Sequence, residues 1–218
     1  IKSGPAFSKV PQSELIAVMR RNSAKAEDYA KRHNVPKWYG DAQALINDPH
    51  INAIYVATPP STHEELTMAA FRAGKPVYLE KPMTTDHASA VRLAAAAKDL
   101  NQKLVVAHYR REQPLFRKIK QLVHDKAIGE PLYVRLELAK PPLTPDELKD
   151  EKIRWRVDPA IAGGGLFHDL SPHQLDLMVY FFGPVEKVAG VSAVQRKQYK
   201  APDMVAGTIL FKNGVAFT

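Results

Sequence analysis

Short apolar runs alternate with amphipathic segments over the first two thirds of the chain. Four runs have the length and composition of buried strands, and the four longer segments among them show helical spacing of apolar residues. This alternation is typical of proteins in which helices cover a parallel sheet. The expected strands are 15–19, 53–57, 76–79 and 104–107, and the expected helices are 24–33, 42–47, 62–73 and 86–101.

The segment 62–73 has the clearest helix signals. Ser61 and Glu64 fit the S-x-x-E pattern of a capping box, in which each side chain binds a backbone amide of the first turn. Small and apolar residues follow at helical spacing, and Gly74 is placed to end the helix. Because the next strand begins at Pro76, we expect a β-α-β unit here.

The pattern changes after Ala107, and we place a domain boundary near residue 110. Residues 1–110 are expected to form one domain, and residues 111–218 an α+β domain with a mainly antiparallel open sheet. The pair Asn213 and Gly214 predicts a tight hairpin turn. The expected elements are helices 113–125 and 172–182 and strands 132–138, 185–194 and 205–211.

Both domains are expected to be incomplete. Residues 1–10 resemble the helix that normally follows a first strand and a glycine-rich turn, and neither precedes them in the sequence. At the other end, residues 215–218 enter a strand that has no sequel.

Composition narrows the function classes. The chain has 218 residues, of which 45% are hydrophobic and 25% charged, and it lacks cysteine, so disulfides and thiolate metal sites are excluded. It has neither a long apolar run nor a secretion signal, and we expect a cytoplasmic protein that does not bind membranes. The net charge of +8 is spread along the chain, and we expect no nucleic-acid partner.

The residues after the expected strands are candidates for chemistry, because ligands of open parallel sheets bind beyond the carboxyl ends of the strands. Arg20 and Arg21 follow the first expected strand. In a dinucleotide-binding domain, guanidinium groups at this position suit the 2'-phosphate of NADP, whereas a carboxylate there would bind the ribose 2'-hydroxyl of NAD. The alternative is a pair of solvated arginines.

Two further turns have distinctive residues. After the second expected strand comes a proline-rich turn, which offers a flat surface with few amide donors, and Lys81 follows the third strand. A partly desolvated lysine there can supply a proton or polarise a carbonyl, although most lysines are merely exposed. His108, Arg110 and Arg111 follow the fourth strand into the same region.

A second cluster lies between residues 163 and 173. Three glycines precede Asp169 and His173, which are four residues apart and share a helical face if the helix extends back that far. Ser171 with Gln174 fits a capping box and Pro172 suits a first helical position. This would place His173 in the first turn, where the helix dipole favours a neutral imidazole. The alternative is a structural, helix-capping histidine.

Four side chains of this region could also suggest a metal site. His168, Asp169, His173 and Asp176 are ligand types that zinc accepts. Since His168 falls on a different helical face from His173, we expect no metal site.

Taken in order, these motifs resemble those of the Gfo/Idh/MocA oxidoreductases, named after glucose-fructose oxidoreductase and inositol dehydrogenase. The matching stretches are A-T-P-P at 57–60 with His63, Y-L-E-K-P at 78–82, Trp155 with Arg156, and the glycine run 163–165 leading to Asp169 and His173. The resemblance spans nearly the whole chain.

The resemblance implies a Rossmann domain followed by an α+β domain whose open sheet mediates contacts between subunits of a homo-oligomer. Lys81 would contact nicotinamide and substrate, His173 would be the acid or base, and Asp169 would position substrate. Cofactor contacts would come from Arg20, Arg21, Thr58, Pro59, Pro60, His63, Glu80, Lys81, Trp155 and Arg156.

The chain departs from the family pattern at three places. The glycine-rich turn is absent, Arg20 and Arg21 replace the more usual Asp-Arg, and Ser171 and Pro172 replace a glycine and an aliphatic residue. The second departure favours NADP over NAD.

We therefore expect hydride transfer between NADP, or NAD, and a secondary alcohol or lactol of a sugar, cyclitol or related polyol. The alternative is a dinucleotide-binding regulatory or scaffold protein without turnover, since fold alone does not fix function.

Overall fold

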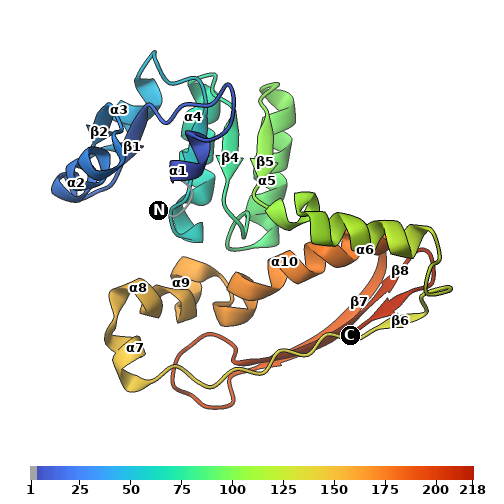
Figure 1. Ribbon diagram of the computed structural model, residues 1–218. Coiled ribbons are helices and arrows are strands. Elements are labelled where there is room, and N and C mark those ends of the chain that lie inside the picture. The colour runs from blue at the N-terminus through green and yellow to red at the C-terminus, as the bar shows by residue number, and fades with distance from the viewer. Residues whose placement is uncertain (1–3) are drawn as a thin grey trace. The chain divides into compact units, whose positions relative to one another are not determined.

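The computed structural model describes residues 4–218 (Figure 1). The chain divides into two compact units. The first runs to Val106, except for Pro59–Ser61, and the second comprises Ala107–Thr218 together with Pro59–Ser61.

The first unit contains the expected parallel strands. They pair as two sheets, β1-β2 and β3-β4-β5, with Ile54 opposite Val77 and Val77 opposite Leu104. The short strand β2 was not predicted. The elements of the chain up to Val106, of which most of η1 belongs to the second unit, are α1 (Gly4–Phe7), β1 (Ala17–Met19), α2 (Ser23–His33), β2 (Lys37–Tyr39), α3 (Ala42–Asn47), β3 (Ile54–Val56), η1 (Pro60–Thr62), α4 (His63–Arg72), β4 (Val77–Leu79), α5 (His87–Asp99) and β5 (Leu104–Val106).

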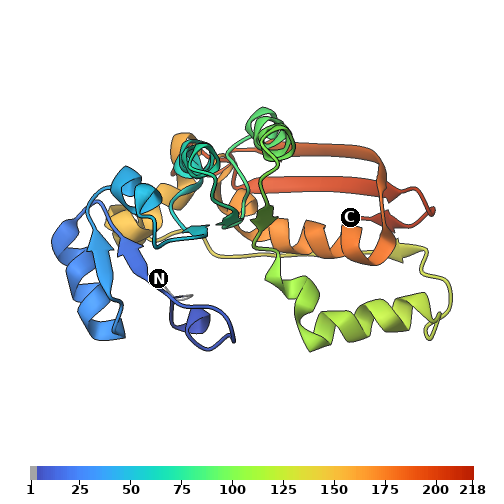
Figure 2. The ribbon, with the colours of Figure 1, turned by 90° about the horizontal axis from the view of Figure 1, so that it is seen from above.

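Helices α4 and α5 lie on the same side of strands β4 and β5 (Figure 2). Apolar residues at alternate positions of β3 and β4 point into this interface, and Leu79 is completely buried there. The intervening residues Tyr55 and Tyr78 stack on each other, and the Phe7 ring of α1 packs edge to face with both. The alternating pattern of these strands therefore supplies two packed surfaces.

The capping box expected at Ser61 is wrong. The 3-10 turn η1 occupies Pro60–Thr62, so Thr62 is the residue that precedes α4, and its side chain does not cap the helix. Its hydroxyl instead donates to the Thr58 hydroxyl at 2.7 Å. Glu64 accepts two hydrogen bonds from Arg92 of α5. Gly74, at a φ of 73°, follows the helix as expected.

The second unit is α+β, with strand order β6-β9-β8-β7. Strands β7, β8 and β9 are antiparallel neighbours, and β6 pairs with β9 in parallel. The elements are η2 (Tyr109–Glu112), α6 (Pro114–His124), β6 (Tyr133–Val134), α7 (Pro145–Lys149), α8 (Glu151–Arg154), η3 (Trp155–Val157), α9 (Pro159–Ala162), α10 (Gly165–Phe182), β7 (Val185–Ala193), β8 (Met204–Phe211) and β9 (Ala216–Phe217).

Helix α10 organises this unit. Its residues Leu177, Met178 and Phe182 pack against Phe211 of β8 and Phe217 of β9, and α6 packs alongside it. None of the helices in the described part of the chain is long and apolar enough to cross a membrane.

The start expected for this helix is wrong. Helix α10 begins at Gly165, so Pro172 lies well inside it, and Ser171 is not a cap but donates its hydroxyl to the Phe167 carbonyl at 2.7 Å. His173 is consequently far from the positive end of the helix, and the dipole argument for a neutral imidazole fails because that effect fades within the first turn.

Candidate active site

In the first unit, the turns after β3 and β4 converge on one group of side chains. The Tyr55 hydroxyl donates to Glu80 Oε1 at 2.5 Å, and the Lys81 backbone N–H donates to Glu80 Oε2 at 3.2 Å. The Glu80 carboxylate thereby links β3 to the residue that follows β4. Lys81 itself is half-buried at this strand end.

His63 fastens the same two turns together. It is completely buried, with Nε2 at 2.8 Å from the Thr58 carbonyl and Nδ1 at 3.0 Å from the Pro82 carbonyl. Burial lowers the pKa of His63, because the charged ring loses its hydration. The histidine therefore holds the backbone of both turns, and the half-buried side chains of Thr58 and Lys81 lie in these turns.

Arg20 and Arg21 follow β1, in the other parallel sheet. The Arg20 N–H donates to the Tyr39 carbonyl of β2, which fixes the backbone at this strand end. The Arg20 side chain is half-buried, and that of Arg21 is exposed. Both arginines thus stand beyond a carboxyl strand end, where a nucleotide ribose is expected.

In the second unit, the glycine run lets α10 begin against a neighbouring segment. Gly165 has a φ of 66°, and a Cβ placed on it would lie 2.6 Å from Cβ of Ala201. Only glycine fits both the conformation and the space. Since the helix extends back to this point, Asp169 and His173 lie on adjacent turns of one face.

Asp169 has a cationic neighbour. Arg156 Nε lies 3.4 Å from Asp169 Oδ2, and the guanidinium stacks over the Trp155 ring, with Cζ 4.6 Å from the ring centroid. Arg156 also donates to the Lys152 carbonyl at 2.5 Å. The pair joins the η3 turn to α10, so the Trp-Arg motif and the Asp-His motif form one cluster within this unit.

His173 is enclosed by aromatic rings and is only 8% exposed. The Tyr109 ring lies at 5.0 Å and the His108 ring at 6.3 Å, both edge to face. Next to them, Arg111 forms a two-pronged ion pair with Asp176 of α10, at 2.8 Å and 2.5 Å. The sequence placed the segment after β5 in this region, but it gave no signal that Arg111 and Asp176 pair.

No cluster of three or more His, Cys, Asp or Glu side chains in residues 4–218 has the geometry of a metal site.

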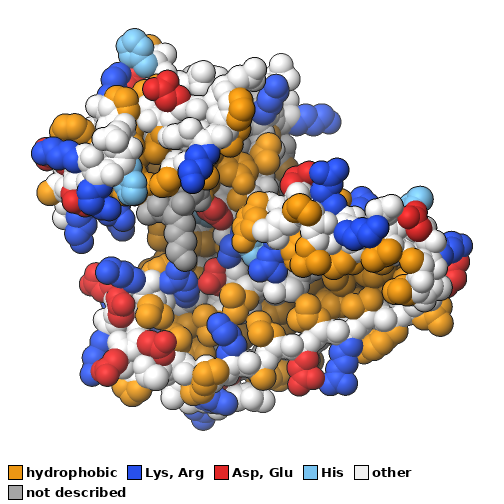
Figure 3. Space-filling model, viewed as in Figure 1, with side chains coloured by type: hydrophobic (Ala, Val, Ile, Leu, Met, Phe, Trp, Pro, Cys, Tyr) orange, Lys and Arg blue, Asp and Glu red, His pale blue; other side chains and the backbone are white. Residues whose placement is uncertain are grey.

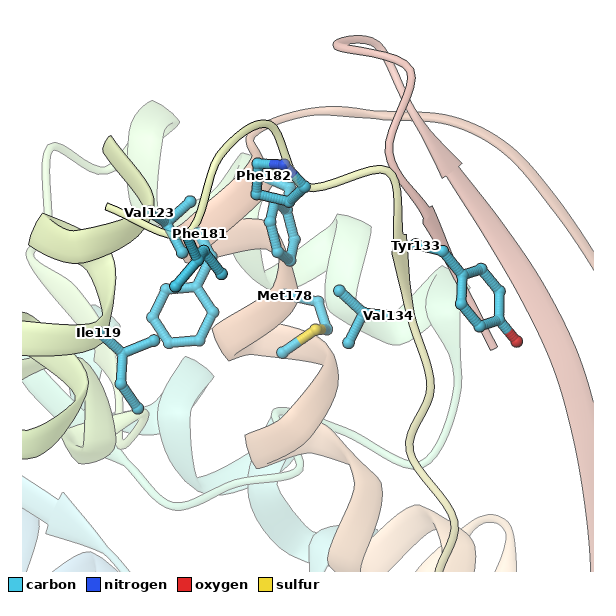
Figure 4. A pocket seen from close by; sticks show the side chains of 9 residues that line it. Ile119, Val123, Tyr133, Val134, Met178, Phe181 and Phe182 are labelled. Atoms are coloured by element: carbon cyan, nitrogen blue, oxygen red, sulfur yellow. The ribbon is translucent and has the colours of Figure 1, made fainter. Parts of the chain in front are cut away.

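An apolar pocket of about 280 Å³ lies elsewhere in the second unit. Helix α10 contributes Met178, Phe181 and Phe182 to it, and α6 contributes Ile119 and Val123 (Figure 4). Apolar side chains also dominate the surface below α6 (Figure 3). Since no charged side chain lines this pocket, it has no groups for proton transfer, and the candidate chemistry stays with the clusters above.

Comparison with known proteins gives matches over most of the chain. Residues 2–108 match the oxidoreductase family with an NAD-binding Rossmann fold, and residues 116–218 match the Gfo/Idh/MocA C-terminal domain. An oxidoreductase of Formosa agariphila is 46% identical over the whole of this chain, which covers 67% of that protein.

Solved structures agree in fold. A levoglucosan dehydrogenase in complex with NADH and levoglucosan has a TM-score of 0.84 at 27% identity, with 99% of this chain and 60% of that one covered. A variant 3-ketoreductase of Actinomadura kijaniata, in complex with TDP-benzene and NADP, has a TM-score of 0.83 at 25% identity, covering 99% and 63%. The chain thus spans about two thirds or less of these proteins.

Both domain matches, the extensive identity to a named oxidoreductase and the parallel-sheet and antiparallel-sheet units lead to one conclusion: the chain belongs to the Gfo/Idh/MocA family of oxidoreductases.

Proposed function

We propose that the protein transfers hydride between a nicotinamide cofactor and a secondary alcohol or lactol of a sugar, cyclitol or related polyol. The observation that supports this most is the pairing of Asp169 and His173 on one face of α10, with His173 almost buried. A protein that only binds dinucleotides has little need of a carboxylate and an imidazole arranged in this way. Levoglucosan, the substrate of one structural neighbour, is a compound of the proposed class.

The roles of the side chains follow from their chemistry. His173 removes the hydroxyl proton of the substrate as general base, and returns it in the reverse direction. The Lys81 ammonium stabilises the negative charge that develops on the substrate oxygen. Asp169, held by Arg156, accepts a hydrogen bond from a neighbouring substrate hydroxyl and so orients it. The nicotinamide ring, when bound, accepts or donates the hydride.

The residues at the strand ends of the first unit fit a dinucleotide. Arg20 and Arg21 offer guanidinium groups for a 2'-phosphate, which favours NADP over NAD. Thr58, Pro59, Pro60 and Glu80 would line the cofactor, with Trp155 and Arg156 as further contacts. His63 would act through the two turns that it ties together, since its own ring is buried.

The assembly and location are also proposals. The exposed valines of β7 suit a contact between subunits of a homo-oligomer. We propose a cytoplasmic enzyme whose only partners are small molecules and further copies of itself.

Titration of the complete protein with NADPH and NADH, followed by a screen of polyols, sugars and aldehydes, tests the function. We expect tighter binding of NADPH and turnover of at least one polyol. Tight cofactor binding without turnover of any compound would favour the scaffold alternative, and equal affinity for NADH would refute the role given to Arg20 and Arg21.

A further inference from the structure

The ion pair of Arg111 and Asp176 joins two elements of the second unit. Arg111 belongs to η2, and its Nε and Nη2 donate to the two carboxylate oxygens of Asp176 on α10, at 2.8 Å and 2.5 Å. The Asp176 side chain is 11% exposed. Hydrogen bonding to Asp176 raises the pKa of Arg111. Two parallel, charge-assisted hydrogen bonds in a partly buried place fix both distance and orientation.

The ion pair is a strong attachment point for the turn η2. None of the residues of η2 is buried, so no buried apolar side chain of its own anchors the turn. The Arg111 guanidinium also lies over the ring of Tyr180, another residue of α10, at 5.3 Å. Arg111 therefore makes the charged contacts that hold η2 on α10.

The attachment of η2 also places two rings, those of Tyr109 and His108, beside His173. Tyr109, two residues before Arg111, places its ring 5.0 Å from the His173 ring, at an interplanar angle of 72°. The His108 ring makes a second contact with His173, with the two ring centroids 6.3 Å apart. Nδ1 of His108 also lies 3.9 Å from Asp176 Oδ2. Asp176 follows His173 by three residues, and so projects from the same side of the helix.

We propose that Asp176 and Arg111 are positioning residues for His173: their ion pair holds η2 against α10, so that the rings of Tyr109 and His108 fix the orientation of the His173 imidazole. This role rests on the proposed function, in which His173 exchanges a proton with the substrate. When the general base is displaced by even a fraction of an ångström, the rate of proton transfer falls. The distant contacts that bind the cofactor do not change.

The test compares conservative variants of the complete protein in two measurements. Asp176→Asn keeps the size of the side chain but removes its charge, and Arg111→Lys keeps the charge but not the two-pronged geometry. Tyr109→Leu removes the ring beside His173 and leaves the ion pair in place. The matched control is Glu137→Gln, which makes the same carboxylate-to-amide change in an exposed ion pair with Arg135 in the same unit.

The first measurement is the NMR signal of the His173 ring protons without substrate, assigned by its loss in His173→Gln. Aromatic rings displace the signals of nearby protons. We expect the signal to move in Asp176→Asn, Arg111→Lys and Tyr109→Leu, and to stay in place in Glu137→Gln. Tyr109 is 51% exposed, so its substitution leaves folding intact even if the ion-pair variants unfold.

The second measurement is steady-state kinetics. Asp176→Asn should lower kcat about tenfold and leave KM for the cofactor unchanged. The kcat of Arg111→Lys should lie between those of Asp176→Asn and the wild type. An unmoved His173 signal in folded Asp176→Asn or in Tyr109→Leu overturns the positioning role, whatever the activity. A displaced signal in a protein that turns over no substrate supports the positioning and refutes the proposed function instead.

Discussion

The β3-β4-β5 sheet of the first unit and the β7-β8 pair of the second are built from similar apolar residues but differ in burial. Leu79 of β4 is completely buried under α4 and α5, whereas Val188 and Val191 of β7 are 70% and 64% exposed. Helices follow and cover the strands of the first unit, as parallel connections require. In the second unit, α10 packs on Phe211 and Phe217, toward the other edge of the sheet.

This difference in burial indicates different roles for the two units. The covered sheet gives a fixed frame whose strand ends present Lys81 and the turns that we propose bind the nucleotide. In the second unit, the proposed acid-base chemistry lies on one helix, α10, whose face carries Asp169 and His173. The valines of β7 in the same unit are exposed to solvent in the single chain. For the stability of the single chain, the first unit is thus expected to tolerate changes at its strand ends but not beneath them, and the second to tolerate changes along β7.

The largest effect is expected at Lys81. Replacing Lys81 with Met removes the charge that stabilises the developing oxyanion, and we expect kcat to fall by about 10²–10³-fold. Cofactor affinity, measured by the fluorescence of bound NADPH, should stay within about threefold because Lys81 would meet only the nicotinamide ring and most of the proposed nucleotide contacts lie elsewhere. Wild-type turnover in this variant would disprove the role.

The two sheets can be compared directly by truncation. Leu79→Ala removes a completely buried side chain, and we expect it to lower the free energy of unfolding by about 3 kcal/mol. Val188→Ala should change it by less than about 0.5 kcal/mol. Denaturant unfolding of both variants is the measurement. The small effect of Val188→Ala is expected at protein concentrations where the subunits are dissociated, because Val188 is exposed in the single chain. A loss that appears only at higher concentration would support the proposed contact through β7, whereas a large loss at every concentration would contradict the difference between the two sheets.

A smaller effect should appear on acidification. Asp48 is buried and accepts hydrogen bonds from Lys37 at 2.7 Å and Tyr39 at 2.8 Å, which hold the pKa of its carboxyl well below the usual range. Its contribution is complete above the unfolded pKa of about 4 and is lost as pH falls below it. The melting temperature of Asp48→Asn should therefore fall less steeply than that of the wild type between neutral and acid pH. An equal fall in both proteins would show that Asp48 does not contribute to the acid sensitivity.

The smallest effect concerns cofactor choice. Changing both Arg20 and Arg21 to Ala should weaken NADPH binding about tenfold and leave NADH binding nearly unchanged. Equilibrium titration with both cofactors measures this. Equal losses for the two would mean that the arginines act on a part of the nucleotide that NADPH and NADH share.

The architecture was predictable because nearly every strand and helix has its own local signal. The fold class and every strand of the described residues except β2 follow from apolar runs and alternation, whereas Lys37–Tyr39 is too short and mixed to stand out. Its pairing with β1 and the anchoring of Asp48 are tertiary effects, and neither leaves a pattern in neighbouring residues.

The helix starts were mispredicted for a related reason. Ser171 and Pro172 look like a cap and a first helical residue, yet α10 runs through both, because the conformation that begins the helix is set by Gly165 against Ala201. Asp169 and His173 were found as a pair because four-residue spacing is local. The partners of His173 and Asp176 come from a segment more than sixty residues away, which spacing cannot reveal.

The central claim is that Lys81 of the first unit and His173 of the second serve one reaction. A double-mutant cycle of Lys81→Met and His173→Gln, with kcat measured on the best substrate from the screen, tests it most directly. Groups that act in the same step are strongly non-additive, so the double variant should be about as slow as the slower single variant. Wild-type turnover in either single variant, or losses that simply multiply in the double variant, would contradict the claim.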